Sequence, residues 1–412
     1  MTPPAPSAPP GRTARLRARL LPAVDAVTGR VLGPYQSAVV RIGFAGTWLL
    51  FLLRELPHRR ELYGPDSPWG WDLAERLVAG NRAFTVLLWT DAGWWFELVY
   101  LLAALAALAT ALGWHTRFAT PLFLIGVLSL QNRSVFMGDG GDNVVHIMAI
   151  YLVLTRCASV WSLDARRAAR RAAAGPDAPP DRVGPALWAL SGAGLVGTVV
   201  ADAPISAGWF LFLTGLWVVQ GLWWAADRAA RRAGVVRVGE GRPGEGRALL
   251  DVLGTIAHNG ALFVIMVEVC LIYATAGWYK IQGSRWQDGT ALYYPLGLDY
   301  FTPWPGLSAL LASSGTAVLL ITYGTVLVQV AFPFTLFHRR IKNVLLAVMM
   351  LEHLGIAVLL GLPVFSLAMI AADAVFLPTS LLLRVGAAAG RARGRIRDRL
   401  RSRGPPPRRV TG

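Results

Sequence analysis

Lysine is rare in this sequence of 412 residues, and one lysine stands where it could do chemistry. Of the 40 basic residues only Lys280 and Lys342 are lysines, and Lys280 ends an apolar run in ATAGWYKIQGSRW. Arginine stays protonated in proteins, whereas a lysine amine in apolar surroundings can lose its proton near neutral pH and act as a base. We therefore predict Lys280 as a catalytic base; the alternative is a lysine that only extends to the lipid headgroups.

Further ionisable residues interrupt the apolar segments, where each costs about 2.5–3.5 kcal/mol unless it finds a partner or a water-lined cavity. Tyr273 lies seven residues before Lys280, on the same helix face, and could share a pocket with it. Glu352 and His353 are adjacent, so they point about 100° apart and cannot both face one pocket squarely. Together such residues predict one buried polar pocket; they are Arg41, Asp139, Asp142, His146, His258, Glu268, Lys280, Glu352, His353 and Asp373.

Two of these carboxylates also have structural explanations. Glu268 lies twelve residues before Lys280, deep in the same segment, and we expect it to pair with a buried cation such as Arg41. Asp373 lies seven residues after Ser366 on one helix face, so the two could line a cavity. A buried pair of Arg41 and Asp373 explains that carboxylate equally well.

Acids and glycines in NRSVFMGDGGDNVVHIM could suggest a metal loop. Three oxygen ligands are too few for a Ca²⁺ site, and the sequence has no set of His and Cys with the spacing of a Zn²⁺ site. We therefore expect no metal, and a helix that begins here with Asp142 or Asn143 as its N-cap. The two cysteines, Cys157 and Cys270, both lie in apolar segments and predict no disulfide framework.

The composition indicates which elements must position these residues. Of the residues 54% are hydrophobic and 16% are charged, against about 25% charged in a soluble domain, and the mean hydropathy is +0.47. These values nearly exclude a soluble enzyme, and the net charge of +16 then indicates basic cytoplasmic loops rather than nucleic-acid binding. We predict an all-α, polytopic integral membrane helical bundle with about ten transmembrane helices, over 37–54, 95–113, 117–135, 143–157, 185–201, 207–226, 257–280, 316–338, 342–361 and 363–385.

Lys and Arg in the connections predict the orientation. Basic blocks at 12–19, 166–171, 228–237 and 339–342 all fall on one side when the N-terminus is inside. This predicts a multi-pass protein of the plasma (cytoplasmic) membrane with both termini cytoplasmic. Residues 1–36 and 386–412 are predicted to be disordered basic tails, the second resting on anionic membrane lipid. The connections 55–94 and 281–315 are rich in Trp and Tyr and suit interfacial helices on the outer face.

Several segments follow the pattern of one known family. They are SAVVRIGFAG, LGWHTRFATPLFLI, VWSLDA, LIYATAGWYKIQGSRWQDGTALYY, and a His353 that precedes Phe365 and Ser366 in VFSLAMI by the family's distance. Over roughly 31–385 the chain resembles the HTTM family, the membrane domain of vitamin K-dependent γ-carboxylase and its bacterial relatives, including the sporulation-delaying protein B group. The most specific feature is Ala-Gly-x-x-Lys followed by Trp and Gly.

The resemblance implies roles for individual residues. It implies that Lys280 deprotonates a reduced quinone, vitamin K hydroquinone or menaquinol, which O₂ then converts to an epoxide while a strong base forms and abstracts a carbon-bound proton. His353 matches a pocket histidine of the family and is the second predicted catalytic residue. The residues predicted to be buried for structural reasons, two of which match family arginines, are Arg41, Arg117, Glu268 and Asp373. The residues predicted to bind substrate or quinone are Tyr273, Trp286, Asp142, Asn143, His146 and Ser366.

The sequence also departs from the carboxylase. The nearest equivalents of its Asn-Asn-His are Gly141, Asp142 and Asn143, with His146 about a turn further on. We expect the large extracytoplasmic domain that holds the protein substrate to be missing, so carboxylation of a docked propeptide is not expected.

Three functions are therefore considered. The first is a membrane enzyme, related to carboxylases and epoxidases, in which quinol epoxidation is coupled to a carbon-acid reaction. The second is a non-catalytic accessory protein for the maturation, export or immunity of a secreted peptide, with a co-encoded membrane or secreted partner. The third is a transporter, although the sequence shows no inverted repeat of the kind that transporters often have.

Overall fold

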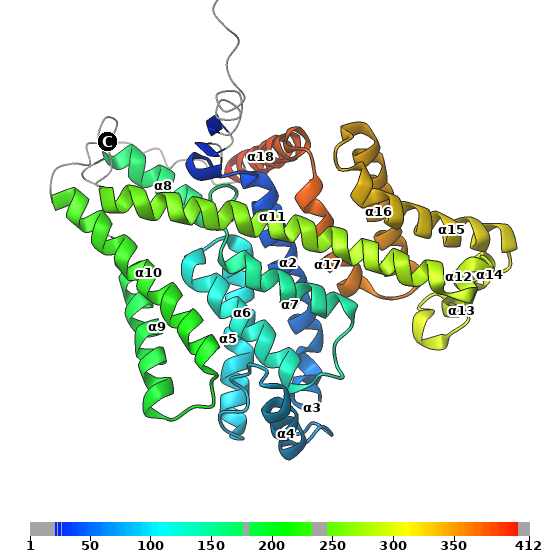
Figure 1. Cartoon of the computed structure of the whole chain (residues 1–412), viewed down its shortest axis with the longest axis horizontal. Coiled ribbons are helices and arrows are strands. Elements are labelled where there is room, and N and C mark those ends of the chain that lie inside the picture. The colour runs from blue at the N-terminus through cyan, green and yellow to red at the C-terminus, as the bar shows by residue number, and fades with distance from the viewer. Residues whose placement is uncertain (1–20, 23, 26, 176–180, 233–244, 403–412) are drawn as a thin grey trace, which may run out of the picture.

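The computed structural model describes residues 21–22, 24–25, 27–175, 181–232 and 245–402, and every regular element in these ranges is a helix (Figure 1). The all-α class is thereby confirmed. The longer helices are α2 (Pro34–Glu55), α5 (Gly93–Leu112), α6 (Thr116–Arg133), α7 (Gly140–Val153), α9 (Val183–Val200), α10 (Ala207–Arg232), α11 (Glu245–Gln282), α15 (Gly315–Ala331), α16 (Arg339–Leu359) and α18 (Thr379–Ser402). The shorter ones are η1 (Leu56–His58), α3 (Arg59–Leu62), α4 (Trp71–Asn81), α8 (Leu163–Ala174), α12 (Ser284–Gln287), α13 (Tyr293–Leu296), η3 (Asp299–Phe301), α14 (Pro305–Ala312), η4 (Phe332–Thr335), α17 (Pro363–Asp373) and η5 (Ala374–Phe376).

The centre of the molecule is formed by α2, α5, α6, α7 and α17, which pack on one another. Small residues allow their backbones to approach closely: a Cβ atom on Gly43 of α2 would lie 2.5 Å from the Cβ of Ala371 on α17. In Figure 1 the long helix α11 crosses this body from α10 to α12, and α15 and α16 lie at its far end. Helix α11 therefore connects the central bundle to the α15–α16 part of the chain.

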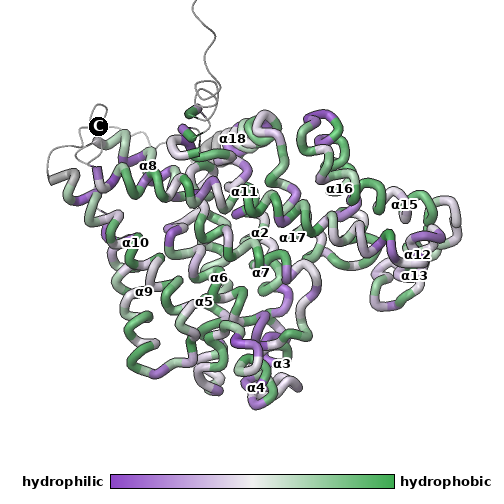
Figure 2. The backbone as a smooth tube through the Cα atoms, viewed as in Figure 1, coloured by the Kyte–Doolittle hydropathy of each residue, from purple (hydrophilic) through white to green (hydrophobic). Residues whose placement is uncertain are grey.

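Seven helical segments of the described chain are long and apolar enough to cross a membrane. They lie in 34–62, 93–112, 183–200, 207–229, 245–282, 315–335 and 339–359. Figure 2 shows hydrophobic residues along α5, α9, α10 and α11 and hydrophilic ones on α4 and α8. Helix α6 does not qualify because polar residues at its two ends lower its mean hydropathy; they are Arg117, Gln131, Asn132 and Arg133. Helix α7 is only 14 residues long. The number of ten spans stays a prediction.

The tenth predicted span, 363–385, is not one straight helix. The segments Pro363–Phe376 and Thr379–Ile396 are bent by 115° at the break between them. Leu377 is extended there and precedes Pro378, which lacks an N–H group and disfavours the helical conformation of the residue before it. If this bent pair counts as one span, the total is eight.

The structure differs from the predicted C-terminal boundary. Helix α18 continues through Ser402, so residues 386–402 are helical where a disordered tail was expected. The reason lies in the composition of this segment, because Ala and Arg are among the best helix formers. Described residues between 21 and 29 are also helical, whereas 1–20 and 403–412 lie outside the described residues. The connections 55–94 and 281–315 contain short helices, α3 and α4 in the first and α12 to α14 in the second.

Candidate functional site

Three helices bring a tyrosine, a histidine and an aspartate together inside the protein. Tyr273 on α11 donates its hydroxyl proton to Asp373 Oδ1 at the end of α17, at 2.9 Å. Its oxygen also lies 2.9 Å from His353 Nε2 on α16. Because the hydroxyl proton is given to Asp373, His353 Nε2 is the donor to the tyrosine oxygen, and the lone pair of the ring is left on Nδ1. All three side chains are buried.

This group leaves polar atoms without partners. Buried atoms with no hydrogen-bond partner are His353 Nδ1, Asp373 Oδ2 and Ser366 Oγ, the last on α17 seven residues before Asp373. Such an atom costs about 1–3 kcal/mol when it is buried without a partner. We call Tyr273, His353 and Asp373, together with Ser366 on the same face of α17 as Asp373, the Tyr273 cluster. The unpartnered atoms would be satisfied only by a group that reaches them from outside this set.

Lys280 belongs to a second group of polar side chains. The two groups are adjacent on α16, where Glu352 of the second group precedes His353 of the first. Lys280 Nζ donates to Gln329 Oε1 on α15 at 2.9 Å, and Gln329 Nε2 donates to Glu352 Oε1 at 2.7 Å. The ammonium also lies 5.1 Å from the centre of the Trp286 ring. We call Lys280, Gln329 and Glu352 the Lys280 chain. The adjacent residues Glu352 and His353 thus serve two different groups, as their angular separation requires.

The predicted residues of α7 lie at a separate cavity of about 190 Å³, which none of Lys280, Tyr273, His353 or Ser366 lines. Asp142 is buried here, His146 is half-buried and Asn143 is exposed. The N-cap is Asp139, which accepts from the backbone N–H of Gly141 and Asp142, while Asp142 Oδ2 accepts from the backbone N–H of Asp139. The expectation of Asp142 or Asn143 as N-cap is therefore wrong, because the reciprocal capping box begins three residues before Asp142.

Arg41 pairs with neither of the carboxylates predicted for it. Its guanidinium is fully buried and donates to the backbone carbonyls of four residues, at 2.6–3.1 Å: Thr110, Ala111, Cys157 and Trp161. The end of α5 and the segment before α8 supply these acceptors, because carbonyl groups at helix ends and in turns lack intrahelical donors; the Thr110 carbonyl also accepts the backbone N–H of Gly113. The predicted ion pairs of Arg41 with Glu268 or Asp373 are thus wrong.

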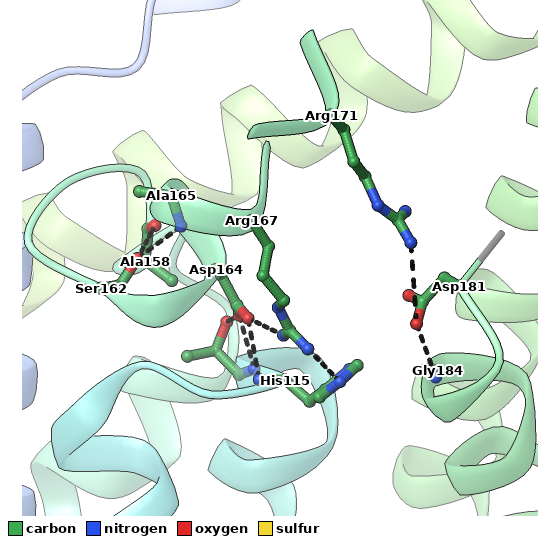
Figure 3. A network of polar contacts seen from close by, with 10 residues as sticks. His115, Ala158, Ser162, Asp164, Ala165, Arg167, Arg171, Asp181 and Gly184 are labelled. Atoms are coloured by element: carbon green, nitrogen blue, oxygen red, sulfur yellow. Dashed lines mark hydrogen bonds and ion pairs between the residues drawn. The ribbon is translucent and has the colours of Figure 1, made fainter. Parts of the chain in front are cut away.

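Asp164 of α8 also binds the turn between α5 and α6, through backbone N–H groups rather than carbonyls. Figure 3 shows Asp164 and Arg167 pointing toward His115 in this turn. Asp164 accepts from the backbone N–H of His115 and of Thr116, both at 2.9 Å, and from the Thr116 hydroxyl and Arg167. Burial alone would raise the pKa of Asp164, but these hydrogen bonds hold it below its ordinary value. Arg41, Asp164 and the groups they bind form what we call the α5–α6 clamp.

His115 has an unusual backbone and a neutral ring in this clamp. Its φ is +43°, in the left-handed region that histidine, unlike β-branched residues, adopts at moderate cost. Arg167 donates to His115 Nε2, so that nitrogen must carry a lone pair. Burial, together with the charge of Arg167, lowers the pKa of His115. The clamp therefore favours neutral histidine.

Two predicted buried residues are less buried than expected. Arg117 is exposed at the start of α6, where it donates to Gln220 Oε1 at 3.1 Å and lies 4.2 Å from the centre of the Trp223 ring. This corrects its assignment as buried: the guanidinium is held against the indole of the neighbouring α10 at the edge of the bundle. Glu268 is half-buried and accepts from the Tyr151 hydroxyl at 3.4 Å.

Comparison with known proteins gives one match. A stretch of 134 residues is 32% identical to "Uncharacterized protein YitO" of Bacillus subtilis (strain 168). This stretch covers 31% of this chain and 41% of that protein. The match thus spans about two fifths of the relative's length. No family profile matches the chain, and no solved structure matches it.

Sequence reasoning missed the residue that joins Lys280 to Glu352. Gln329 is a lone amide in the apolar run GTVLVQVAFP, and it is only 5% exposed. The rule that buried polar groups need partners could have identified it, but the glutamines in the apolar segments were not among the predicted site residues. In the described ranges, no three His, Cys, Asp or Glu residues lie together as a metal site would need.

Proposed function

We propose that the chain is a multi-pass membrane protein with both termini on the cytoplasmic side. The apolar helices and the basic connections described above support this topology. Both termini can lie on the same side only if the number of spans is even, so this topology is compatible with eight or ten spans. Reporter fusions at residue 412 and within 202–206 test it: a protein that is fluorescent only in the cytoplasm should be bright at the first position and dark at the second. The reverse pattern would contradict the topology.

Within this protein, we propose that Lys280 is the base that deprotonates a reduced quinone. The observation that carries the proposal is the hydrogen-bond partner of its amine, an amide oxygen rather than a carboxylate, in a chain that otherwise uses arginine almost everywhere. An amide, unlike a carboxylate, does not fix a positive charge on the amine. A base needs such surroundings, because it must exist without its proton before it accepts one.

The Tyr273 cluster completes the proposed site. A quinol has two ring hydroxyls, and the unpartnered atoms His353 Nδ1 and Asp373 Oδ2 are acceptors that can orient the second hydroxyl while Lys280 takes the proton of the first. The Ser366 hydroxyl can donate to an oxygen of the same ring. The assignment of the chain to the HTTM family is part of this proposal, and the family's chemistry supplies the reaction.

The proposed reaction consumes dioxygen and is balanced without another oxidant. Lys280 accepts a proton from the quinol hydroxyl, and the resulting anion adds O₂. One oxygen atom becomes the epoxide, so two C–O bonds form at the expense of the ring double bond and the O–O bond breaks. The second oxygen leaves as hydroxide carrying the proton of the second quinol hydroxyl, as both hydroxyls become carbonyls. The hydroxide becomes water with the proton that Lys280 returns, or with one taken from a carbon acid, which is left as a carbanion that Lys280 can reprotonate. The quinol is oxidised and O₂ is reduced.

The test is quinol epoxidation by the full chain purified in detergent. Vitamin K hydroquinone or menaquinol is supplied with O₂, and the epoxide is measured by chromatography. We expect epoxide with the wild type and none with Lys280→Ala or Lys280→Arg. Lys342→Arg is the matched control, because it changes the other lysine of the chain, and it should keep the wild-type rate.

A negative result also has a defined meaning. If the folded wild type forms no epoxide with either quinol, the enzyme proposal is wrong. Co-purification of a peptide or of a co-encoded protein would then support the accessory function instead.

A further inference from the structure

The cavity beside α7 is lined by residues of α2, α6 and α7 and of the connections before α4 and before α7. Trp48 and Phe51 come from α2, Tyr63 follows α3, and Asp142 and His146 come from α7. Its charges are of one sign: Asp139 and Asp142 line it, and no Lys or Arg does. Such a lining favours a cation or a neutral donor over a carboxylate.

One carboxylate oxygen in this cavity lacks a partner. Asp142 is 4% exposed, and while its Oδ2 accepts the backbone N–H of Asp139 at 2.8 Å, its Oδ1 is buried with no hydrogen bond. Both oxygens of a buried carboxylate normally find donors. Asp142 therefore presents a free acceptor in a lining that supplies no cation.

The histidine next to it offers a second acceptor. Gln131 Nε2 donates to the Asp142 carbonyl at 2.7 Å, which turns Gln131 Oε1 toward His146 Nδ1 at 2.9 Å. An amide oxygen only accepts, so His146 Nδ1 must carry the proton. In the neutral ring, the lone pair then lies on Nε2.

Aromatic side chains form another part of the lining. The rings of Trp48 and Phe51 are stacked with centres 5.0 Å apart, and Tyr63 is 4% exposed beside them. Aromatic faces attract organic cations. The Trp48 Nε1–H is buried without an acceptor, so a ligand oxygen could also be bound.

We propose that this cavity binds the primary ammonium group of a 2-aminoethanol-type ligand. Asp142 Oδ1 and His146 Nε2 accept two of its N–H donors, the aromatic rings face the cation, and Trp48 Nε1 donates to the neighbouring oxygen. A free amino alcohol and the headgroup of an ethanolamine phospholipid share this chemistry. The site is independent of the quinol reaction proposed for Lys280.

The experiment compares ligands that differ only in the charged group. Isothermal titration calorimetry is performed on the full chain in detergent free of ethanolamine lipids, with ethanolamine and with ethylene glycol. We expect saturable binding of ethanolamine and at least tenfold weaker binding of ethylene glycol. Glycerophosphoethanolamine that binds more tightly than ethanolamine identifies the lipid headgroup as the source, whereas weaker binding identifies the free amine.

The variants locate the site. Asp142→Asn keeps an oxygen that can accept the Asp139 N–H, so the cap is retained, and it should weaken ethanolamine binding at least tenfold. Asp288→Asn, an exposed acid in the 281–315 connection, should leave binding unchanged. The proposal is overturned if the folded wild type shows no saturable binding of either amine, or if ethylene glycol binds as well as ethanolamine; neither result depends on a variant.

Discussion

The α5–α6 clamp and the Tyr273 cluster are both buried and polar, but only the clamp satisfies its charged groups. In the clamp, four backbone carbonyls accept from Arg41, and both oxygens of Asp164 accept hydrogen bonds. In the Tyr273 cluster, His353 Nδ1, Asp373 Oδ2 and Ser366 Oγ have no partner. The clamp joins segments of backbone, whereas the cluster joins side chains of three helices.

This difference separates a structural role from a functional one. A charge that binds only backbone carbonyls fixes where helices begin and end, and removal of Arg41 leaves three of its four carbonyls unpaired. A cluster that keeps unpaired atoms bears a cost that folding alone does not explain, which is typical of sites that bind a ligand. We therefore expect substitutions in the clamp to reduce stability and substitutions in the cluster to reduce activity.

The largest effect is expected for Arg41→Leu. It leaves the carbonyl oxygens of Ala111, Cys157 and Trp161 without a donor, and since each buried polar group left unpaired costs about 1–3 kcal/mol, the loss should be about 3 kcal/mol or more. The protein should then fail to give a monodisperse peak in size-exclusion chromatography. Arg54→Leu, at an exposed arginine on the same helix, is the control. A well-folded Arg41→Leu protein with the wild-type melting temperature would refute the structural role.

Asp164→Ala should have a smaller effect on the same clamp. It removes the acceptor of two backbone N–H groups and one hydroxyl at the α5–α6 turn, so we expect a loss of about 2 kcal/mol. Thermal unfolding in detergent, followed by circular dichroism, measures it. Asp164→Asn, which keeps one acceptor oxygen, should fall between Ala and wild type; equal stability of all three would show that the turn does not need this side chain.

Two serines test the comparison with the same substitution. Ser162 accepts from the backbone N–H of Ala165 and donates to the Ala158 carbonyl, whereas Ser366 Oγ has no partner. Ser162→Ala should cost about 1 kcal/mol, as expected for an N-cap. Ser366→Ala should leave the melting temperature unchanged or raise it, because it removes an unpaired buried polar atom, and it should lower quinol turnover. A loss of stability in Ser366→Ala but not in Ser162→Ala would contradict the distinction between a structural clamp and a functional cluster.

The smallest expected effect is a pH dependence of the clamp. The pKa of His115 is lowered in the folded protein from about 6.5 in the unfolded chain. Its contribution to stability is therefore complete above pH 6.5 and is lost as the pH falls toward the folded value. Wild-type protein should lose more melting temperature between pH 7.5 and 5.5 than His115→Asn, a variant that tolerates positive φ but does not titrate. Identical losses would contradict this.

Much of the helical architecture could be predicted from apolar length. The predicted segments 95–113 and 185–201 differ by two residues or fewer from the ends of α5 and α9. Helix α11 begins twelve residues earlier than predicted, at Glu245, because its first turns are amphipathic rather than apolar. The bend at Pro378 was missed because the apolar run continues through it.

The site could be predicted only in part, since it depends on contacts between distant helices. Helical spacing indicated Tyr273, Ser366 and Asp373, and the structure brings Tyr273 and Asp373 into contact. Spacing could not show that Arg41 binds carbonyls, because every residue has a backbone carbonyl whatever its side chain. It also could not separate the α7 cavity from Lys280, because both were assigned to one pocket on polarity alone.

The central claim, that Lys280 does chemistry which the clamp does not, is tested most directly by two measurements on one preparation of Lys280→Arg. The melting temperature and the rate of O₂-dependent epoxide formation from vitamin K hydroquinone are determined beside the wild type. We predict an unchanged melting temperature and no epoxide, because arginine keeps the charge but does not act as a base. Epoxide formed at the wild-type rate by the folded variant would contradict the account.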